Sequence, residues 1–266
     1  MYKTIPKKIH YCWFGKNPIS PLGLRCIDTW RSKLPDYELI LWNEDNTDLT
    51  HPFTQYAYSN QKWAFVSDYV RLKAIYDHGG IYLDTDMFML KNLDELLDRD
   101  FFIGAERNDL ISCGIIAATA GHSVIERALN YYNEHPLTEK YFRLAIPRVM
   151  TRAIEAQYKI QEASFDEVFE IERLTIYPPN YFYPLPYVKD RPFEKKFLDY
   201  AKEETYAIHL WEGSWVSYSE FQHIRRREYY KGFKVIFKNF GARSLSFPYI
   251  RKVLRSFKDS IIRKYD

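Results

Sequence analysis

Hydrophobic and polar positions follow a helical period over residues 64–76. The apolar residues there recur at spacings of three and four, as expected for a helix with one buried stripe: Phe65, Val66, Tyr69, Leu72 and Tyr76. Gly79 and Gly80 follow this segment, and glycine takes the left-handed conformation that ends a helix without steric cost. Residues 81–83 are β-formers. The pattern therefore predicts a helix, a glycine stop and a short strand.

The patterns along the rest of the chain predict an α/β protein, because strand and helix patterns alternate. Predicted strands cover residues 5–15, 37–42, 101–105, 111–118 and 207–211. Predicted helices cover residues 24–33, 93–97, 123–135 and the stretch from 248 onward. Residues 176–184 contain three prolines and are predicted to form an extended loop, whose tyrosines either line an acceptor groove or pack inside.

The strongest chemical signal is a pair of carboxylates at the end of the strand that follows the glycines. Strand alternation places Asp84 and Asp86 on one side and Thr85 on the other. Two such carboxylates repel each other unless a cation or hydrogen-bond donors lie between them. A divalent ion that also binds phosphate oxygens suits this position, and the alternative is a turn whose aspartates cap the next element. In the preceding helix, Asp68 and Arg71 are three residues apart and project from one face.

Eight positions in this region form the pattern S-D-x-x-R-x7-G-G-x-Y-x-D-x-D, made by Ser67, Asp68, Arg71, Gly79, Gly80, Tyr82, Asp84 and Asp86. The pattern resembles the signature of glycosyltransferase family 32, whose members include capsular polysaccharide transferases and initiating mannosyltransferases. It is more distantly similar to the large glucosylating toxins. The resemblance implies a GT-A, Rossmann-like fold with a mixed central sheet flanked by helices, a nucleotide-sugar donor, Mn²⁺ or Mg²⁺, and transfer with retention at the anomeric carbon.

The resemblance also implies roles for particular residues. The implied catalytic residues are Asp68, Arg71, Asp84 and Asp86, and the implied metal ligands are Asp84, Asp86 and His209. The implied nucleotide-binding residues are Tyr11, Cys12, Trp13, Asn43, Tyr82, Asp84, Ser214 and Trp215. For Trp13 a place in the core is the alternative, and for Asn43 a turn. The chain departs from the family at Ser112 and at Ala145, where an asparagine and T-G-P are usual, so the sugar specificity does not carry over.

Composition sets the wider limits. A chain of 266 residues with 46% hydrophobic residues suits one large α/β domain. Its 3 cysteines are an odd number without C-x-x-C spacing, which favours neither a disulfide framework nor a zinc site and fits a reducing compartment. Neither a signal-peptide core nor 18 consecutive apolar residues occur, so we expect a cytoplasmic protein that does not span a membrane.

Charge separates the end of the chain from the rest. Residues 223–266 contain thirteen Lys and Arg against three acidic residues and so carry +10, which leaves −7 on residues 1–222 because the whole chain carries +3. In the same segment Ile250, Val253, Leu254, Phe257 and Ile261 follow a helical period. We therefore expect a catalytic domain at 1–222 and a basic amphipathic segment at 223–266. That segment either contacts the anionic inner face of the cell membrane or packs on the domain, and no module for nucleic acid accompanies it.

These observations predict a metal-dependent retaining glycosyltransferase. It would move a hexose from a nucleotide sugar, with a UDP-sugar favoured, to a saccharide acceptor such as a lipid-linked oligosaccharide in surface polysaccharide synthesis. The alternatives are a non-catalytic nucleotide-sugar-binding or scaffold protein and a D-x-D phosphohydrolase. Phosphohydrolases of that type need Thr or Val where Phe88 stands.

Overall fold

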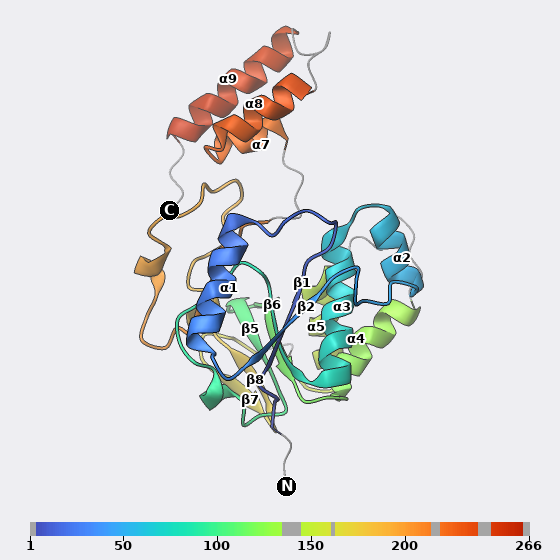
Figure 1. Ribbon diagram of the computed structural model, residues 1–266. Coiled ribbons are helices and arrows are strands. Elements are labelled where there is room, and N and C mark those ends of the chain that lie inside the picture. The colour runs from blue at the N-terminus through green and yellow to red at the C-terminus, as the bar shows by residue number, and fades with distance from the viewer. Residues whose placement is uncertain (1–3, 135–144, 161–162, 214–218, 239–245, 263–266) are drawn as a thin grey trace. The chain divides into compact units, whose positions relative to one another are not determined.

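The computed structural model describes residues 4–134, 145–160, 163–213, 219–238 and 246–262 (Figure 1). Helix α3 (Trp63–His78) is the helix predicted from the hydrophobic period. It ends at Gly79 and Gly80, whose φ angles are 62° and 113°, and strand β3 (Gly80–Leu83) follows at once. A Cβ on Gly80 would lie 2.8 Å from the carbonyl oxygen of Lys8. Glycine is therefore required here by both backbone angle and space.

The core of the fold is a seven-stranded sheet in the order β2-β1-β3-β6-β5-β8-β7. Its other strands are β1 (Lys8–Cys12), β2 (Glu38–Trp42), β5 (Phe101–Arg107), β6 (Leu110–Ala118), β7 (Phe169–Ile171) and β8 (Leu174–Tyr177). Strand β1 pairs in parallel with β2 and β3, whereas β6 pairs antiparallel with β3 and β5. The predicted α/β class with a mixed central sheet is therefore confirmed.

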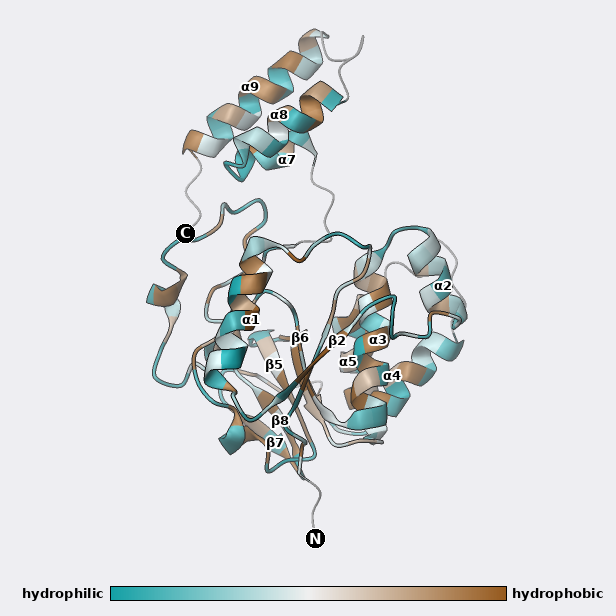
Figure 2. Ribbon diagram, viewed as in Figure 1, coloured by the Kyte–Doolittle hydropathy of each residue, from teal (hydrophilic) through white to brown (hydrophobic). Residues whose placement is uncertain are grey.

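Helices cover this sheet and bury its apolar residues. They are α1 (Pro21–Lys33), α2 (Pro52–Ser59), α3, α4 (Ser123–Glu134) and α5 (Ile146–Glu155). Helices α3, α4 and α5 gather beside one another in Figure 1 and share one hydrophobic core with the strands. The strands are mostly brown in Figure 2, whereas the helices carry teal residues on their outer sides. The helices predicted at 24–33 and 123–135 correspond to α1 and α4.

A second, two-stranded sheet pairs β4 (Met87–Met89) antiparallel with β9 (Ala207–His209). In its register Met87 lies opposite His209. This pairing brings a residue from late in the chain beside the residues that follow β3.

The prediction of an extended loop at 176–184 is wrong. Strand β8 includes the first residues of this segment and pairs in parallel with β5, and the short helix α6 (Pro179–Phe182) follows it. Proline is tolerated in the first turn of a helix, because the amide hydrogen that it lacks has no partner there. The prediction of a helix at 93–97 is only partly right, since the structure has a single 3₁₀ turn at Asp94–Leu96.

The chain divides into two compact units. The first comprises Met1–Leu185 and Leu198–Leu210 and holds both sheets. A 3₁₀ turn at Phe197–Tyr200 lies at the boundary, with only Phe197 assigned to the second unit. The second comprises Pro186–Phe197 and Trp211–Asp266 and holds α7 (Glu220–Arg225), α8 (Tyr229–Lys238) and α9 (Phe247–Ile262). Among the described helices, none combines the length and the apolar character needed to cross a bilayer.

Candidate active site

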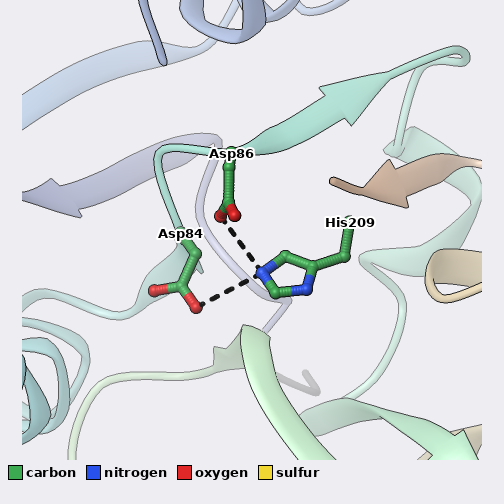
Figure 3. A group of neighbouring side chains, drawn as sticks. All are labelled: Asp84, Asp86 and His209. Carbon is green, nitrogen blue, oxygen red and sulfur yellow. Dashed lines mark ion pairs between the residues drawn. The ribbon is translucent and has the colours of Figure 1, made fainter. Parts of the chain in front are cut away.

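Two carboxylates and an imidazole converge at the ends of β3 and β9. The Nε2 atom of His209 lies 3.1 Å from Oδ1 of Asp86 and 3.8 Å from Oδ2 of Asp84 (Figure 3). One ligand atom from each of the three residues lies within 4.8 Å of the other two. The structure thus brings together the three residues that the family resemblance implied as metal ligands.

The reason for this convergence differs from the predicted one. Strand β3 ends at Leu83, so Asp84 and Asp86 are not alternating residues of one strand. They lie in a turn that the Met87 amide closes by donating to the Asp84 carbonyl at 3.0 Å. The Asp84 amide donates to the Gly114 carbonyl at 2.8 Å, and the Leu210 amide donates to the Asp86 carbonyl at 3.0 Å. The turn is therefore fixed at both ends, by β6 and by the residue after β9.

Arg71 holds one oxygen of Asp84 and leaves the other toward His209. Its Nη1 lies 3.2 Å from Oδ1 of Asp84, and the Tyr82 hydroxyl donates to the same oxygen at 3.0 Å. The Arg71 side chain is almost fully buried, and its guanidinium lies over the Tyr82 ring, 4.3 Å from the ring centre. It also donates to the Cys113 carbonyl at 2.8 Å, which fixes its plane. Oδ2 of Asp84 is left to face the imidazole (Figure 3).

Asp68 is the second partner of Arg71. Its Oδ1 lies 3.1 Å from Nη2 of Arg71, as the i, i+3 spacing predicted. Burial raises the pKa of Asp68 to about 7, although the guanidinium of Arg71 and a hydrogen bond from the Ile146 amide act in the opposite direction. One buried cation therefore stands between two carboxylates.

The electrostatics around His209 favour a positive charge. Burial disfavours the imidazolium, but the carboxylates of Asp86 and Asp84 outweigh it, so the pKa of His209 is raised above its ordinary value. Burial also raises the pKa of nearby Glu106. A proton on His209 would neutralise part of this acidic charge, and a cation placed among the three ligand atoms would neutralise it more fully.

The donor set fits a divalent ion. Two carboxylates and one imidazole are ligands that Mn²⁺ accepts, and Mg²⁺ takes the carboxylates together with phosphate oxygens. Gly114 lies beside these ligand atoms, and a side chain there would approach them. A Cβ there would lie 3.4 Å from both Oδ2 of Asp84 and Cδ2 of His209.

Gly114 and Tyr183 belong to this site, although no sequence pattern pointed to them. The Tyr183 ring lies edge-on to His209 at 5.6 Å between ring centres, and its hydroxyl accepts a hydrogen bond from the Ile115 amide at 3.1 Å. Tyr183 lies in the proline-rich segment, where an aromatic side chain packed inside was one of the two expectations. The contact that places Tyr183 in the site is its hydrogen bond with Ile115 of β6. The sequence alone does not show that these two segments meet.

The other predicted nucleotide-binding residues have distinct places. Tyr11 and Cys12 are buried at the end of β1, where burial raises the pKa of Cys12 to about 12 and Arg71 and Asp84 act on it electrostatically. The Trp13 indole donates to the Asn17 carbonyl at 2.6 Å, and Asn43 accepts from the Asp45 amide at 2.9 Å within a turn. Ser214 and Trp215 lie outside the described residues. Nucleotide contact by any of these residues stays a prediction.

Two family models match successive parts of the chain. Residues 23–103 match the model described as "Glycosyltransferase sugar-binding region containing DXD motif", and residues 117–231 match "Alpha 1,4-glycosyltransferase conserved region". Asp84 and Asp86 fall within the first match, and His209 falls within the second. The predicted resemblance to DXD-containing sugar transferases is therefore confirmed.

The alignments with curated relatives cover between 45% and 58% of this chain. Lactosylceramide 4-alpha-galactosyltransferase of Pongo pygmaeus is 28% identical over 153 residues, which cover 55% of this chain and 66% of the relative. Human alpha-1,4-N-acetylglucosaminyltransferase is 28% identical over 159 residues, covering 58% and 45% of the two chains. Inositol phosphoceramide mannosyltransferase 3 of Schizosaccharomyces pombe is 32% identical over 131 residues, covering 45% and 35%. The chain thus spans about one third to two thirds of these relatives.

Solved structures with a similar arrangement are also glycosyltransferases. PaToxG glycosyltransferase is 20% identical with a TM-score of 0.48, covering 60% of this chain and 72% of its own. The galactosyltransferase LgtC is 10% identical with a TM-score of 0.40, covering 92% and 99%. Scores this low carry no information on donor or acceptor.

Proposed function

We propose, from the premise that this chain carries the DXD-containing sugar-binding region of glycosyltransferases, that it transfers a hexose from a nucleotide-sugar donor to a saccharide acceptor. The observation that carries the proposal is the convergence of Asp84, Asp86 and His209 in front of the buried Arg71. A scaffold that only keeps the fold has no need to hold two carboxylates together against their mutual repulsion, with an imidazole beside them.

A divalent ion would be held by Asp84, Asp86 and His209, and when bound it neutralises the charge that develops on the departing nucleoside diphosphate. The residues of the chain prepare that position. Arg71 and Tyr82 fix one oxygen of Asp84, which also fixes the direction of its other oxygen. Binding an ion would therefore cost the Asp84 side chain little conformational entropy. Asp68 shares Arg71 and, by the resemblance, accepts hydrogen bonds from donor-sugar hydroxyls. Mn²⁺ suits the imidazole better than Mg²⁺ does.

We favour a UDP-hexose donor and a lipid-linked saccharide acceptor. The names of the relatives specify galactosyl, N-acetylglucosaminyl and mannosyl transfer, and two of them name ceramide lipids as acceptors. Two of the names also specify an alpha linkage. UDP-hexoses ordinarily carry their sugar in the α configuration, so an α product corresponds to retention. A role in surface polysaccharide synthesis and a cytoplasmic location stay predictions from the sequence.

The proposal is tested by substituting one ligand. Asp86→Asn keeps the size of the side chain but removes the charge that binds a divalent ion. We expect transfer and hydrolysis of the cognate donor to fall at least about a hundredfold, since removing a group that stabilises developing charge has an effect of that order. The measurement is the release of nucleoside diphosphate from a panel of UDP- and GDP-hexoses with and without Mn²⁺. Asp36→Asn, at an exposed position, is the matched control.

Other outcomes separate the alternatives. Donor binding by calorimetry without any turnover would support a non-catalytic binding protein instead. Release of inorganic phosphate from simple phosphate esters would support a phosphohydrolase. Turnover by Asp86→Asn equal to that of Asp36→Asn would reject the assignment of the site.

A further inference from the structure

Helix α9 packs within its own unit through small polar side chains. Ser256 and Ser260 are both 0% exposed. The Ser260 hydroxyl lies 3.2 Å from the Tyr229 hydroxyl, and the Ser260 carbonyl accepts from Nε of Arg227 at 2.9 Å. Arg225 adds an ion pair with Asp259 at 3.2 Å. Polar contacts therefore hold much of α9 in place, and Phe257 is the residue of its apolar stripe that packs on α8, against Tyr229 and Phe233.

As a result, most of that stripe is exposed. Phe247 is 78% exposed, Ile250 42%, Leu254 63% and Ile261 75%. Their spacings of three, four and seven place them on one face of the helix. Among the described residues of this unit, no packing contact covers these side chains, so the stripe is free to contact a partner.

Helix α8 presents a similar stripe. Tyr230 is 81% exposed, Phe233 43% and Phe237 72%, at spacings of three and four. The two stripes meet at Phe257, whose ring centre lies 5.9 Å from that of Phe233. Both helices show brown residues along their length in Figure 2. Together these side chains form the α8–α9 apolar face, made of Tyr230, Phe233, Phe237, Phe247, Ile250, Leu254 and Ile261.

The two helices that carry this face hold many basic residues and almost no acidic ones. The two helices contain the cations Lys231, Lys234, Lys238, Arg251, Lys252, Arg255 and Lys258, and a single acidic residue, Asp259. That acid is already paired with Arg225. Large exposed apolar patches mark interaction sites, and a cationic rim selects partners with negative charge.

We propose that the α8–α9 apolar face docks on a bilayer that contains anionic lipids. The aromatic and aliphatic side chains would enter the boundary between headgroups and acyl chains, while the lysines and arginines contact lipid phosphates. A second copy of the chain fits less well, because a two-fold interface would place the same cationic rim against itself. None of the residues of this face belongs to the candidate active site, so the docking proposal does not depend on the proposed transferase function.

The test is flotation of the full chain with vesicles of phosphatidylcholine alone or mixed with phosphatidylglycerol. We expect binding to the mixed vesicles that weakens with added salt. Phe237→Ser combined with Leu254→Ser should lower the partition constant about tenfold, because two inserted side chains are lost. Leu24→Ser, which changes a leucine of α1 that is 48% exposed, is the matched control and should bind as the unaltered chain does.

A second pair of variants tests the cationic rim. Lys234→Gln combined with Lys258→Gln should weaken binding to mixed vesicles by about fivefold for each removed cation and leave binding to neutral vesicles unchanged. Donor hydrolysis in solution should be the same in all these variants, so failure of the transferase proposal is seen separately. Vesicle binding unaffected by the serine pair, or a dimer in sedimentation that the serine pair dissociates, would overturn the proposal.

Discussion

The two carboxylate oxygens of Asp84 have different roles. One of its oxygens is held by Arg71 and Tyr82, and the other faces His209. Without the first set of contacts, a carboxylate beside Asp86 would turn away from its neighbour to relieve repulsion. Arg71 is therefore a residue that positions a ligand, and its own burial depends on the two carboxylates that it pairs with.

Replacing Arg71 by methionine tests that dependence. The substitution leaves Asp68 and Asp84 in a buried place without their cation, so we expect a loss of about 3–5 kcal/mol in the free energy of unfolding. Arg31→Met is the matched control, because Arg31 also pairs with an aspartate three residues earlier but is 61% exposed. Its loss should be within about 1 kcal/mol. Urea denaturation of both variants measures the difference, and equal losses would show that the buried pair does not stabilise the site.

His10 gives a prediction on pH. It is 0% exposed, and its Nδ1 accepts from the Trp42 indole at 3.1 Å while Nε2 lies 2.9 Å from the Gly79 carbonyl. Both ring nitrogens are thus used by the neutral imidazole, with the proton on Nε2. Burial lowers the pKa of His10 from 6.5 to about 4.

The unfolded chain consequently binds a proton at His10 between pH 6.5 and about 4, whereas the folded chain does not. Its contribution to stability is fully present above pH 6.5 and falls as the pH is lowered, by about 3 kcal/mol in total. His10→Gln keeps a donor and an acceptor but does not titrate. The difference in unfolding free energy between the two proteins should shrink as the pH falls from 7 to 4, and a constant difference would contradict the assignment.

Among elements, the turn between α3 and β3 connects the predicted helix to the site. Gly80→Ala would place a Cβ against the backbone of Lys8 in β1, whereas Gly121→Ala, also at positive φ, meets nothing within 4 Å. We expect Gly121→Ala to lower stability by about 1–2 kcal/mol through backbone angle alone. Gly80→Ala should lower it by clearly more and weaken donor turnover, since β3 carries Tyr82 and leads to Asp84. Urea denaturation and turnover assays on both variants check this, and equal losses would mean that β1 moves aside without cost.

The elements also show which parts of the fold could be predicted from the sequence. Helix α3, its glycine stop and β3 have a strong local signal, and the i, i+3 pair of Asp68 and Arg71 follows from helical geometry alone. The turn that contains Asp84 and Asp86 was only the alternative expectation, because an aspartate pair after a strand also fits a strand end. The role of His209 as a metal ligand was implied only by the family resemblance. Its place opposite Met87 depends on the β4–β9 register, which joins segments far apart in the sequence.

At the scale of the whole molecule, the chain separates its charge. The last 44 residues, 223–266, carry +10 while residues 1–222 carry −7. If the basic unit holds the protein on an anionic surface, an acceptor embedded in such vesicles should be used at a lower apparent KM than the same acceptor in neutral vesicles. Added salt should abolish that advantage, because counterions screen the attraction. Turnover of a water-soluble acceptor under the same salt series is the control and should change little.

The β4–β9 pairing has a consequence for the time at which the protein becomes active. The residue that completes the ion site is made long after the two aspartates, so a nascent chain on the ribosome has the aspartates without their histidine. Until β9 has left the exit tunnel and paired with β4, the growing polypeptide lacks one of the three ligands of the proposed ion site. Under the proposed function, synthesis itself would keep an incomplete chain from consuming activated sugar.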